Sequence, residues 1–303
     1  MYLIEGQMIS YARASQLLRE IFGLQVSAGS LVRWVGACSQ ALTEVETRIK
    51  AGLRKAGVIH QDETGVRVRR HHSYVHVCST PHLTHFGYHP SRGRVALNAI
   101  GILAGFGGTS IHDGLNIYPG YPCQHALCNV HHLRELTFVE EELKQPWAKK
   151  MKELLLDMKE EVAQAKATGH TQLDVIKLAN FHFQYGALIR EGLELNPKAP
   201  PPPGYKRMKQ SPTWNLLDRL HRYREATLRF LHDFAVAFDN NQAERDLRMI
   251  KVQQKVSGEF RTDLGAEYFC RIRSYLSTLH KQGLPLLAAL QQTLTGHPVL
   301  PTF

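Results

Sequence analysis

The first 56 residues show the spacing of two short amphipathic helices. In YARASQLLREIF the apolar stripe consists of Ala12, Leu17, Leu18 and Phe22. Gly23 ends this pattern, and Ser27 is a favourable N-cap for a second helix, which we expect to run to about residue 55. Two helices joined by a short turn that contains glycine are typical of a helix-turn-helix, which would place Arg33 in a DNA major groove. A helical hairpin that only packs explains the same pattern.

Between residues 57 and 130 the apolar positions alternate as they do in β-strands. GVIHQDETG, HHSYVHVCST and LTHFGYHP predict three strands joined by short turns. RGRVALNAIGIL predicts a helix, and TSIHDG and HALCNV predict a fourth and a fifth strand. Three antiparallel strands followed by a helix and further strands is the order of the ribonuclease-H fold.

The remaining sequence has mostly helical spacing. We expect one long charged helix from residue 131 to 167, another from 214 to 233, and two more after residue 240. The predicted fold is therefore α/β: a ribonuclease-H-like catalytic core with a helical insertion, preceded by a small helix-turn-helix. The predicted ranges are 1–56 for the helix-turn-helix and linking helix, 57–137 for the first part of the core, 138–235 for the insertion, and 236–303 for the second part of the core.

Composition narrows the classes of partner. The formal charge of +10 and the pI of about 9.4 favour a polyanion, although ribosomes, acidic membranes or simple solubility explain the charge equally well. No run of about 18 apolar residues exists, so no membrane span is expected. The start lacks a secretory signal, and five cysteines do not form a disulfide scaffold, so we expect a bacterial cytoplasmic, nucleoid-associated protein.

Three acidic residues occupy positions suited to metal ligation. Asp62 lies in the first strand, Asp113 ends the fourth strand, and Glu244 lies in the first turns of a late helix. Two cations that act on a phosphodiester need acidic ligands from different elements, and carboxylate oxygens suit Mg²⁺ or Mn²⁺. Each residue also has a structural explanation: a strand end, an Asp-Gly turn, and a capping box that begins at Asn241. Their order along the fold favours the metal site.

Basic residues surround the third carboxylate. Four of them are candidates for contacts with DNA phosphates: Arg245, Arg248, Lys251 and Lys255. Asp246 falls on nearly the opposite side of the helix from Glu244 and is a poorer ligand candidate. An exposed helix face with balanced charges is the structural alternative.

At these residues the chain resembles the DDE transposases of the insertion sequence sixty-six family. The matching blocks are HQDETGVRV, IHDGLNIYPG, HALCNVHHLREL and FDNNQAERDLRMIKVQQKVSGEFRT. The resemblance implies that Asp62, Asp113 and Glu244 are the catalytic triad, with a mostly helical insertion between the second Asp and the Glu. Relatives carry a further N-terminal coiled-coil and zinc-finger-like region that this chain lacks, so it is either a shorter variant or a truncated copy.

The expected function is therefore metal-dependent cleavage and strand transfer of insertion-sequence DNA ends, with two Mg²⁺ or Mn²⁺ ions. The expected partners are transposon-end and target DNA, a second copy of the chain in a dimer or higher assembly, and accessory proteins of the same element. A nuclease on the same fold and a decayed DNA-binding protein without catalysis are the alternatives.

Two histidine-rich segments need their own interpretation. Cys128-x-x-His131 could be half of a zinc site, with His125, Cys123 or His132 as further ligands. The alternative is a strand-to-helix junction with a buried cysteine, which we favour because no second well-spaced cysteine pair appears. We interpret the histidines at 71–89 as mostly surface or DNA-facing.

Overall fold

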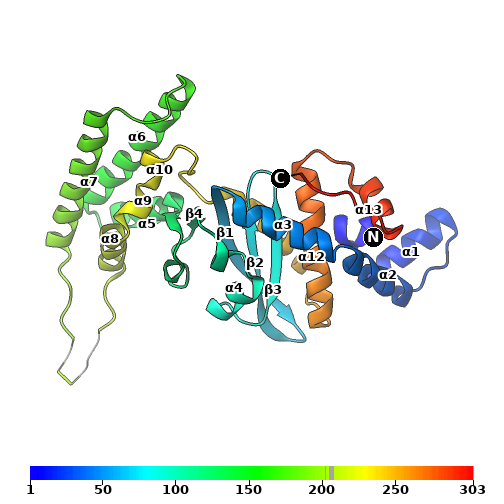
Figure 1. Cartoon of the computed structure of the whole chain (residues 1–303). Helices are drawn as coiled ribbons and strands as arrows, with labels where there is room; N and C mark the ends of the chain where they lie inside the picture. The colour runs from blue at the N-terminus through cyan, green and yellow to red at the C-terminus, as the bar shows by residue number, and fades with distance from the viewer. Residues whose placement is uncertain (202, 205–207, 303) are drawn as a thin grey trace. The chain divides into compact units, whose positions relative to one another are not determined.

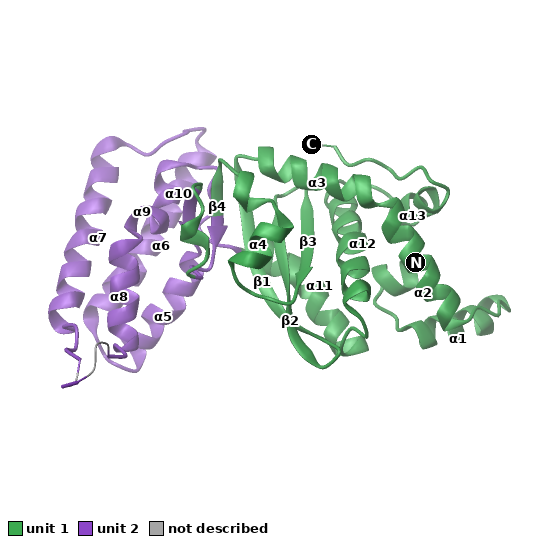
Figure 2. Cartoon of the chain, turned by 60° about the horizontal axis from the view of Figure 1, so that its bottom comes forward, with its two compact units in different colours: residues 1–110, 116–123, 241–303 green, residues 111–115, 124–240 purple. Residues whose placement is uncertain are grey.

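The computed structural model describes residues 1–201, 203–204 and 208–302 (Figure 1). It contains two compact units (Figure 2): unit 1 comprises residues 1–110, 116–123 and 241–303, and unit 2 comprises residues 111–115 and 124–240. Both helices and a β-sheet are present, which confirms the predicted α/β class. The predicted ranges 1–56, 57–137, 138–235 and 236–303 stay predictions. None of the helices in the described part of the chain is long and apolar enough to cross a membrane.

The sheet has the strand order β3-β2-β1-β4-β5. Its strands are β1 (Val58–Val68), β2 (His71–Ser79), β3 (Thr84–His89), β4 (Thr109–His112) and β5 (Gln124–Leu127). The first three form the predicted antiparallel meander, and helix α4 (Arg94–Ile100) follows β3. This order is consistent with a ribonuclease-H-like core. Strand β4 is divided: Thr109 and Ser110 belong to unit 1, where the Thr109 N–H donates to the Gly57 carbonyl at 2.8 Å.

One face of the meander builds the main core of unit 1 against two late helices, α11 (Asn241–Ser257) and α12 (Asp263–Lys281). Side chains alternate across a strand, so every second residue points to this face. The buried cluster includes Val66, Val75, Val77 and Phe86 from the sheet, and Ala243, Leu247, Ile250 and Phe269 from the helices. Full burial of one such side chain stabilises the fold by about 1.5–3 kcal/mol, so this cluster fixes α11 on β1 and β2.

Helix α12 covers the edge strand β3. The Thr84 N–H donates to the Thr278 hydroxyl at 3.0 Å, and the Phe86 N–H donates to the Ser274 hydroxyl at 2.8 Å. Both hydroxyls are buried on the helix face. An uncovered edge strand would expose a row of unpaired backbone groups, so these small polar residues protect the sheet from pairing with another chain.

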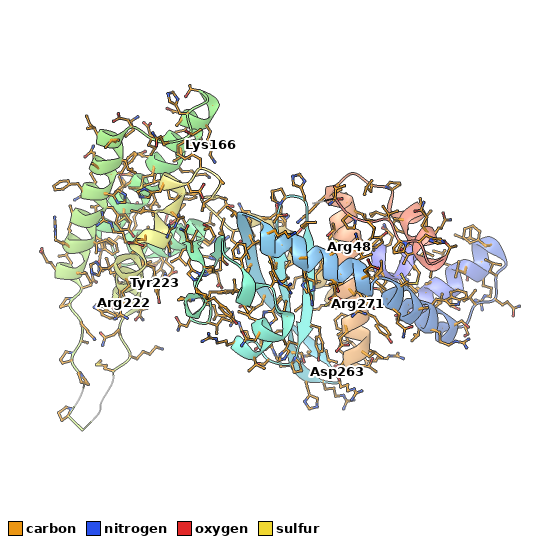
Figure 3. The ribbon with its side chains drawn as sticks, viewed as in Figure 1. Arg48, Lys166, Arg222, Tyr223, Asp263 and Arg271 are labelled. Carbon is orange, nitrogen blue, oxygen red and sulfur yellow. The ribbon has the colours of Figure 1, made fainter. Side chains whose placement is uncertain are left out.

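Helix α3 (Thr43–Lys55) is linked to β3 by Glu46. The His85 Nε2 lies 3.0 Å from one Glu46 oxygen, and the Arg271 guanidinium of α12 donates to the other at 2.5 Å (Figure 3). Burial alone would raise the pKa of the Glu46 carboxyl, but the hydrogen bonds from His85 and Arg271 outweigh it and hold the pKa at about 2. Helix α4 approaches closely at Gly87, where a Cβ atom would lie 2.7 Å from Ile100.

Two helices precede α3, as predicted: α1 (Tyr11–Phe22) and α2 (Ala28–Ala41). Gly23 has a φ of +68° and ends α1, and the Ser27 side chain accepts from the Ser30 N–H at the start of α2. The expectation of one helix to residue 55 was wrong, because α2 ends at Ala41 and α3 begins at Thr43. The Thr43 hydroxyl donates to the Gln40 carbonyl, and this local bond competes with regular helical bonding.

The predicted apolar stripe of α1 was also only partly right. Phe22 is 63% exposed, whereas Ala14 is buried with Ile4 and Leu31. The π-helical turn Tyr2–Gly6 supplies Ile4, and this turn selects which face of α1 is covered. Helix α13 (Leu286–Leu294) was not predicted and packs on α2.

Unit 2 is mainly helical. Its helices are α5 (Asn129–Glu141), α6 (Pro146–Ala167), α7 (Val175–Leu195), α8 (Pro212–Arg222), α9 (Arg224–Thr227) and α10 (Arg229–His232). The single helix expected from 131 to 167 is therefore two helices, because Lys144 has a φ of +53° and Pro146 lacks the N–H that a continuing helix needs. The single helix expected from 214 to 233 is three. Trp147 is fully buried in this bundle.

The turn between β1 and β2 is unusual. Val68 pairs with His71, so Arg69 and Arg70 form a two-residue loop, and their φ angles are +48° and +67°. Positive φ at both positions defines a type I′ turn, which normally takes Asn-Gly. An L-residue other than glycine pays about 1–2 kcal/mol in this region, so the two arginines strain the turn.

Candidate active site

Strand β1 places Asp62 on the face of the sheet that carries α11. Asp62 lies directly opposite Val77 of β2, and directly opposed residues in an antiparallel pair point to the same face. Val77 belongs to the cluster that Ala243 and Leu247 of α11 complete. The Asp62 carboxylate is partly exposed, and one of its oxygens accepts the Glu63 N–H at 2.8 Å.

Helix α11 carries Glu244 on its first turn, next to the buried Ala243. Ala243 and Leu247 pack on the sheet, and Glu244 is partly exposed beside them. Within unit 1 the structure therefore brings Asp62 and Glu244 to the same side of the sheet. Asn241 is the first residue of α11, so the position of Glu244 also agrees with the capping-box alternative.

Glu63 points to the opposite face, as strand alternation predicts. Its side chain is 1% exposed, and one oxygen accepts from Arg92 at 2.6 and 2.8 Å. The Tyr118 hydroxyl donates to the other oxygen at 2.8 Å. Arg92 and Tyr118 hold this buried carboxylate and brace β1 directly behind Asp62. Nothing in the sequence pattern marked either residue, because both lie outside regular elements.

Removing the cation of this group tests its structural role. Arg92→Ala should lower the free energy of unfolding by about 2–3 kcal/mol, because it leaves a buried carboxylate without its charge partner. Glu63→Gln in the same chain should recover part of the loss, since a neutral amide needs no cation. Urea unfolding of the two single variants and the double variant measures the coupling. Strictly additive losses would show that the pair is not coupled.

Asp113 directly follows β4 in unit 2. One of its oxygens accepts the Leu115 N–H at 3.0 Å, and Gly114 has a φ of +92°. The preceding His112 accepts the Gly114 N–H on its Nδ1 at 3.1 Å. The turn expected from the Asp-Gly pair is therefore present, and Asp113 is partly exposed at its start.

The other carboxylate of α11 has a structural partner. Asp246 accepts from the Lys281 ammonium at 2.8 Å, and both side chains are nearly buried. Lys281 also donates to the Thr80 carbonyl at 2.9 Å. Asp246 thus ties α11 to α12 and to the end of β2, which agrees with its rejection as a ligand on helical spacing.

The basic candidates around Glu244 are exposed. Arg245, Arg248, Lys251 and Lys255 all lie on the solvent side of α11. Arg33 of α2 is exposed as well, with one contact of 3.3 Å to the Ser30 hydroxyl. Unit 1 contains 20 Lys and Arg against 11 Asp and Glu, a net charge of +9, whereas unit 2 contains 17 against 16, a net +1. The excess positive charge therefore belongs to unit 1.

Cys128 lies between β5 and α5 and is buried. Its sulfur accepts the Asn240 N–H at 3.2 Å, and its ligand atom lies within 4.8 Å of one on His131. Two of the proposed further ligands have other partners: His132 bonds Asn129 at 3.1 Å, and His125 bonds His112 at 3.1 Å. The buried cysteine at a strand-to-helix junction is the arrangement that the alternative to zinc predicts.

The histidines at 71–89 divide into two groups. His71, His72 and His82 are exposed, but His76 and His85 are buried. The surface interpretation was therefore wrong for these two. Burial lowers the pKa of His76 to about 4 and also lowers the pKa of His85, so both rings are neutral at pH 7.

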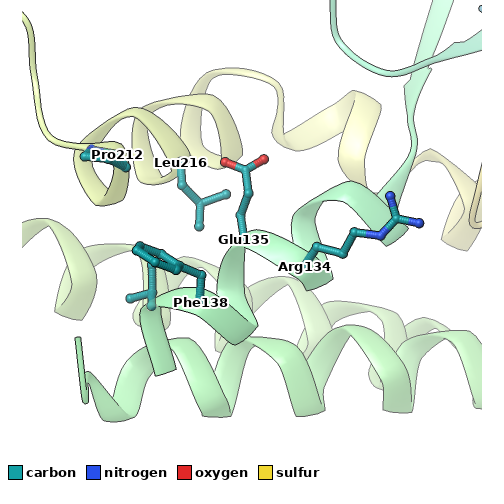
Figure 4. A pocket seen from close by; sticks show the side chains of 6 residues that line it. Arg134, Glu135, Phe138, Pro212 and Leu216 are labelled. Carbon is teal, nitrogen blue, oxygen red and sulfur yellow. The ribbon is translucent and has the colours of Figure 1, made fainter. Parts of the chain in front are cut away.

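Unit 2 has a shallow hollow between α5 and α8, with a volume of about 190 Å³ (Figure 4). Phe138, Leu216 and Pro212 line it, and Glu135 at its rim bonds Arg219. An apolar floor with a single ion pair offers no group for phosphodiester chemistry, so the hollow is not an active-site candidate.

Comparison with known proteins places the chain. The model of the family described as Transposase IS66 family matches residues 2–268. No curated protein matches the chain. The match covers β1, β4 and α11 with the three carboxylates, and it ends only within α12. The family implies transposition of DNA and a requirement for divalent metal ions. The chain therefore belongs to the IS66 family of transposases.

Proposed function

We propose that this transposase cleaves insertion-sequence DNA ends and joins them to target DNA, with Asp62, Asp113 and Glu244 as metal ligands and catalytic residues. The observation that carries the proposal is the position of Asp62 and Glu244 on the same side of the sheet in unit 1, each partly exposed. Two carboxylates from a strand and a helix far apart in sequence supply hard oxygen ligands from separate elements.

Chain connectivity supports the third member. Asp113 is three residues beyond Ser110, which is in unit 1. Three residues span at most about 11 Å, so Asp113 remains close to the end of β4. Asp62 and Asp113 both follow closely on the start of neighbouring strands, since Thr109 bonds Gly57 immediately before β1.

The donor set suits Mg²⁺ or Mn²⁺. When bound, two such ions would activate a nucleophile and stabilise the charge on the leaving 3′ oxygen. The residues of the chain hold and orient: the carboxylates fix the position of the reacting phosphodiester, and the exposed Arg245, Arg248, Lys251 and Lys255 hold adjacent phosphates. Arg33 on α2 would contact DNA if α1 and α2 act as a helix-turn-helix.

Transposition requires two DNA ends to be processed together. We therefore expect a dimer or higher assembly on DNA, with accessory proteins of the same element as further partners. Binding should weaken steeply with salt, because phosphate contacts release counterions.

The test is incubation of the protein with end DNA, a target plasmid and Mn²⁺. Joined products support a transposase, and cleavage without joining indicates a nuclease on the same fold. Binding without either reaction, with wild-type behaviour in Asp62→Asn, indicates a DNA-binding protein without catalysis and contradicts the proposal.

A further inference from the structure

The end of the β1–β2 hairpin is a second basic surface of unit 1. We define the hairpin tip as Arg67–His72. Three arginines and two histidines occur within these six residues, and the tip contains no acidic residue. Arg67, Arg69, Arg70, His71 and His72 are all exposed. The tip belongs to the unit that carries a net charge of +9.

The backbone of the tip is held rigidly from behind by the segment between α11 and α12. The Arg69 N–H donates to the Phe260 carbonyl at 3.1 Å, and the Phe260 N–H donates to the Arg67 carbonyl at 2.9 Å. The Arg70 N–H donates to the Glu259 carboxylate at 2.7 Å. Phe260 itself belongs to the buried cluster under the sheet, so this bracing ties the turn to the core.

The side chains of the tip are available to an anion. The Arg69 side chain is 61% exposed and lies 3.7 Å from Asp263, which Figure 3 labels. In the described part of the chain, neither Arg67 nor Arg70 forms an ion pair. A fixed backbone that presents guanidinium groups outward loses little entropy on binding, and guanidinium matches phosphate geometry.

The choice of residues in the turn indicates a function. Arg69 and Arg70 both have positive φ, in a turn that Asn-Gly would form without strain. Residues kept in a strained conformation concentrate at ligand-binding sites. Two adjacent arginines here add cationic groups at a cost to stability, whereas a purely structural turn has no need of them.

We propose that the hairpin tip binds the phosphate backbone of duplex DNA, as an anchor separate from the carboxylates. This inference rests on the proposed function, which supplies DNA as the substrate. Arg67 is five residues along β1 from Asp62, or about 16 Å at the rise of a strand. Duplex DNA rises about 3.4 Å per base pair, so the tip would hold a phosphate about five base pairs from the reacting one.

The decisive variant replaces the turn by Arg69→Asn with Arg70→Gly. Its salt dependence should weaken: the slope of log K against log salt should fall by about 2, near 0.9 for each lost phosphate contact, and affinity near 150 mM salt should fall roughly tenfold or more. The same variant should melt at a higher temperature, by about 2–5 °C, because the strain is relieved. Loss of binding with a gain of stability cannot come from misfolding.

Two controls complete the experiment. Arg69→Lys with Arg70→Lys keeps the charges and should keep the salt slope. Arg190→Gln with Arg222→Gln removes two exposed arginines from unit 2 and should leave binding unchanged. Fluorescence anisotropy with a duplex of random sequence, between about 50 and 200 mM KCl, gives the affinities and the slopes.

The outcomes separate the two proposals. An Asn-Gly variant that binds with the wild-type affinity and slope, while wild type cleaves and joins DNA, overturns the anchor and leaves the proposed function standing. A wild-type chain that binds no duplex at any salt concentration overturns both.

Discussion

Glu244→Gln is expected to reduce DNA cleavage by about a thousandfold or more, equal to about 4 kcal/mol of transition-state stabilisation. The substitution keeps the size of the side chain and removes the charge that a metal ligand needs. Glu244 is partly exposed on the first turn of α11, so the free energy of unfolding should change by less than about 1 kcal/mol. Cleavage rates in Mn²⁺ and urea unfolding curves measure the two effects separately.

Asp246→Asn is the matched control, two residues along the same helix. It should show the reverse pattern: near wild-type cleavage, and a loss of about 1–3 kcal/mol in stability, since it discharges one partner of the nearly buried pair with Lys281. If both variants cleave DNA like wild type, the assignment of Glu244 is wrong. If Glu244→Gln instead unfolds the chain, Glu244 serves as a helix cap.

Stability is expected to fall by several kcal/mol as the pH is lowered from 7 toward 5. Burial lowers the pKa of His76 to about 4, and burial with the adjacent His125 lowers the pKa of His112 to about 3. The pKa of His132 is also about 3, through burial and the charge of Arg219, and the pKa of the buried His85 is lowered. All four rings are neutral in the folded chain.

The sign follows from proton uptake. An unfolded histidine takes up a proton near pH 6.5, but each folded ring does so only at a lower pH. Between these values the unfolded chain binds more protons, so each ring costs about 1.4 kcal/mol of stability per pH unit below 6.5.

Urea midpoints at pH 7.5, 6.5 and 5.5 test this expectation. His76→Gln should flatten the dependence by the share of one proton. Midpoints that do not change across this range would contradict the neutral buried state of these histidines.

The carboxylate contributed by Glu46 acts at lower pH. Its folded pKa of about 2 lies below the ordinary value, so its stabilisation is present above about pH 4.5 and is lost only as the pH falls toward 2. Glu46 therefore adds nothing to the change expected between pH 7 and 5.

The alternation of apolar residues determined the meander and the division of its faces. From it, Asp62 and Glu63 were expected on opposite sides of β1, and the structure has Asp62 on the α11 face and Glu63 buried against Arg92. Alternation is a local property of an extended chain, and the pairing of neighbouring strands reads it directly. The order of the elements and the family-like blocks were equally local signals.

Helix ends were predicted less well, since they depend on single local interactions. Helical spacing continued across Leu42 and across residues 142–145, but the Thr43 hydroxyl bond and the positive φ of Lys144 broke the helices there. Periodicity averages over several turns and does not register one such interruption.

What only the tertiary structure decided is which polar residues become partners across long sequence distances. Arg92 and Tyr118 around Glu63, Lys281 around Asp246, and Phe260 behind the strained Arg69–Arg70 turn come from segments that no short motif connects. The sequence by itself determined the residue types, the α/β class and the family. A buried charge or a bent turn is stabilised by whatever the fold brings next to it, and that depends on the packing of the whole unit.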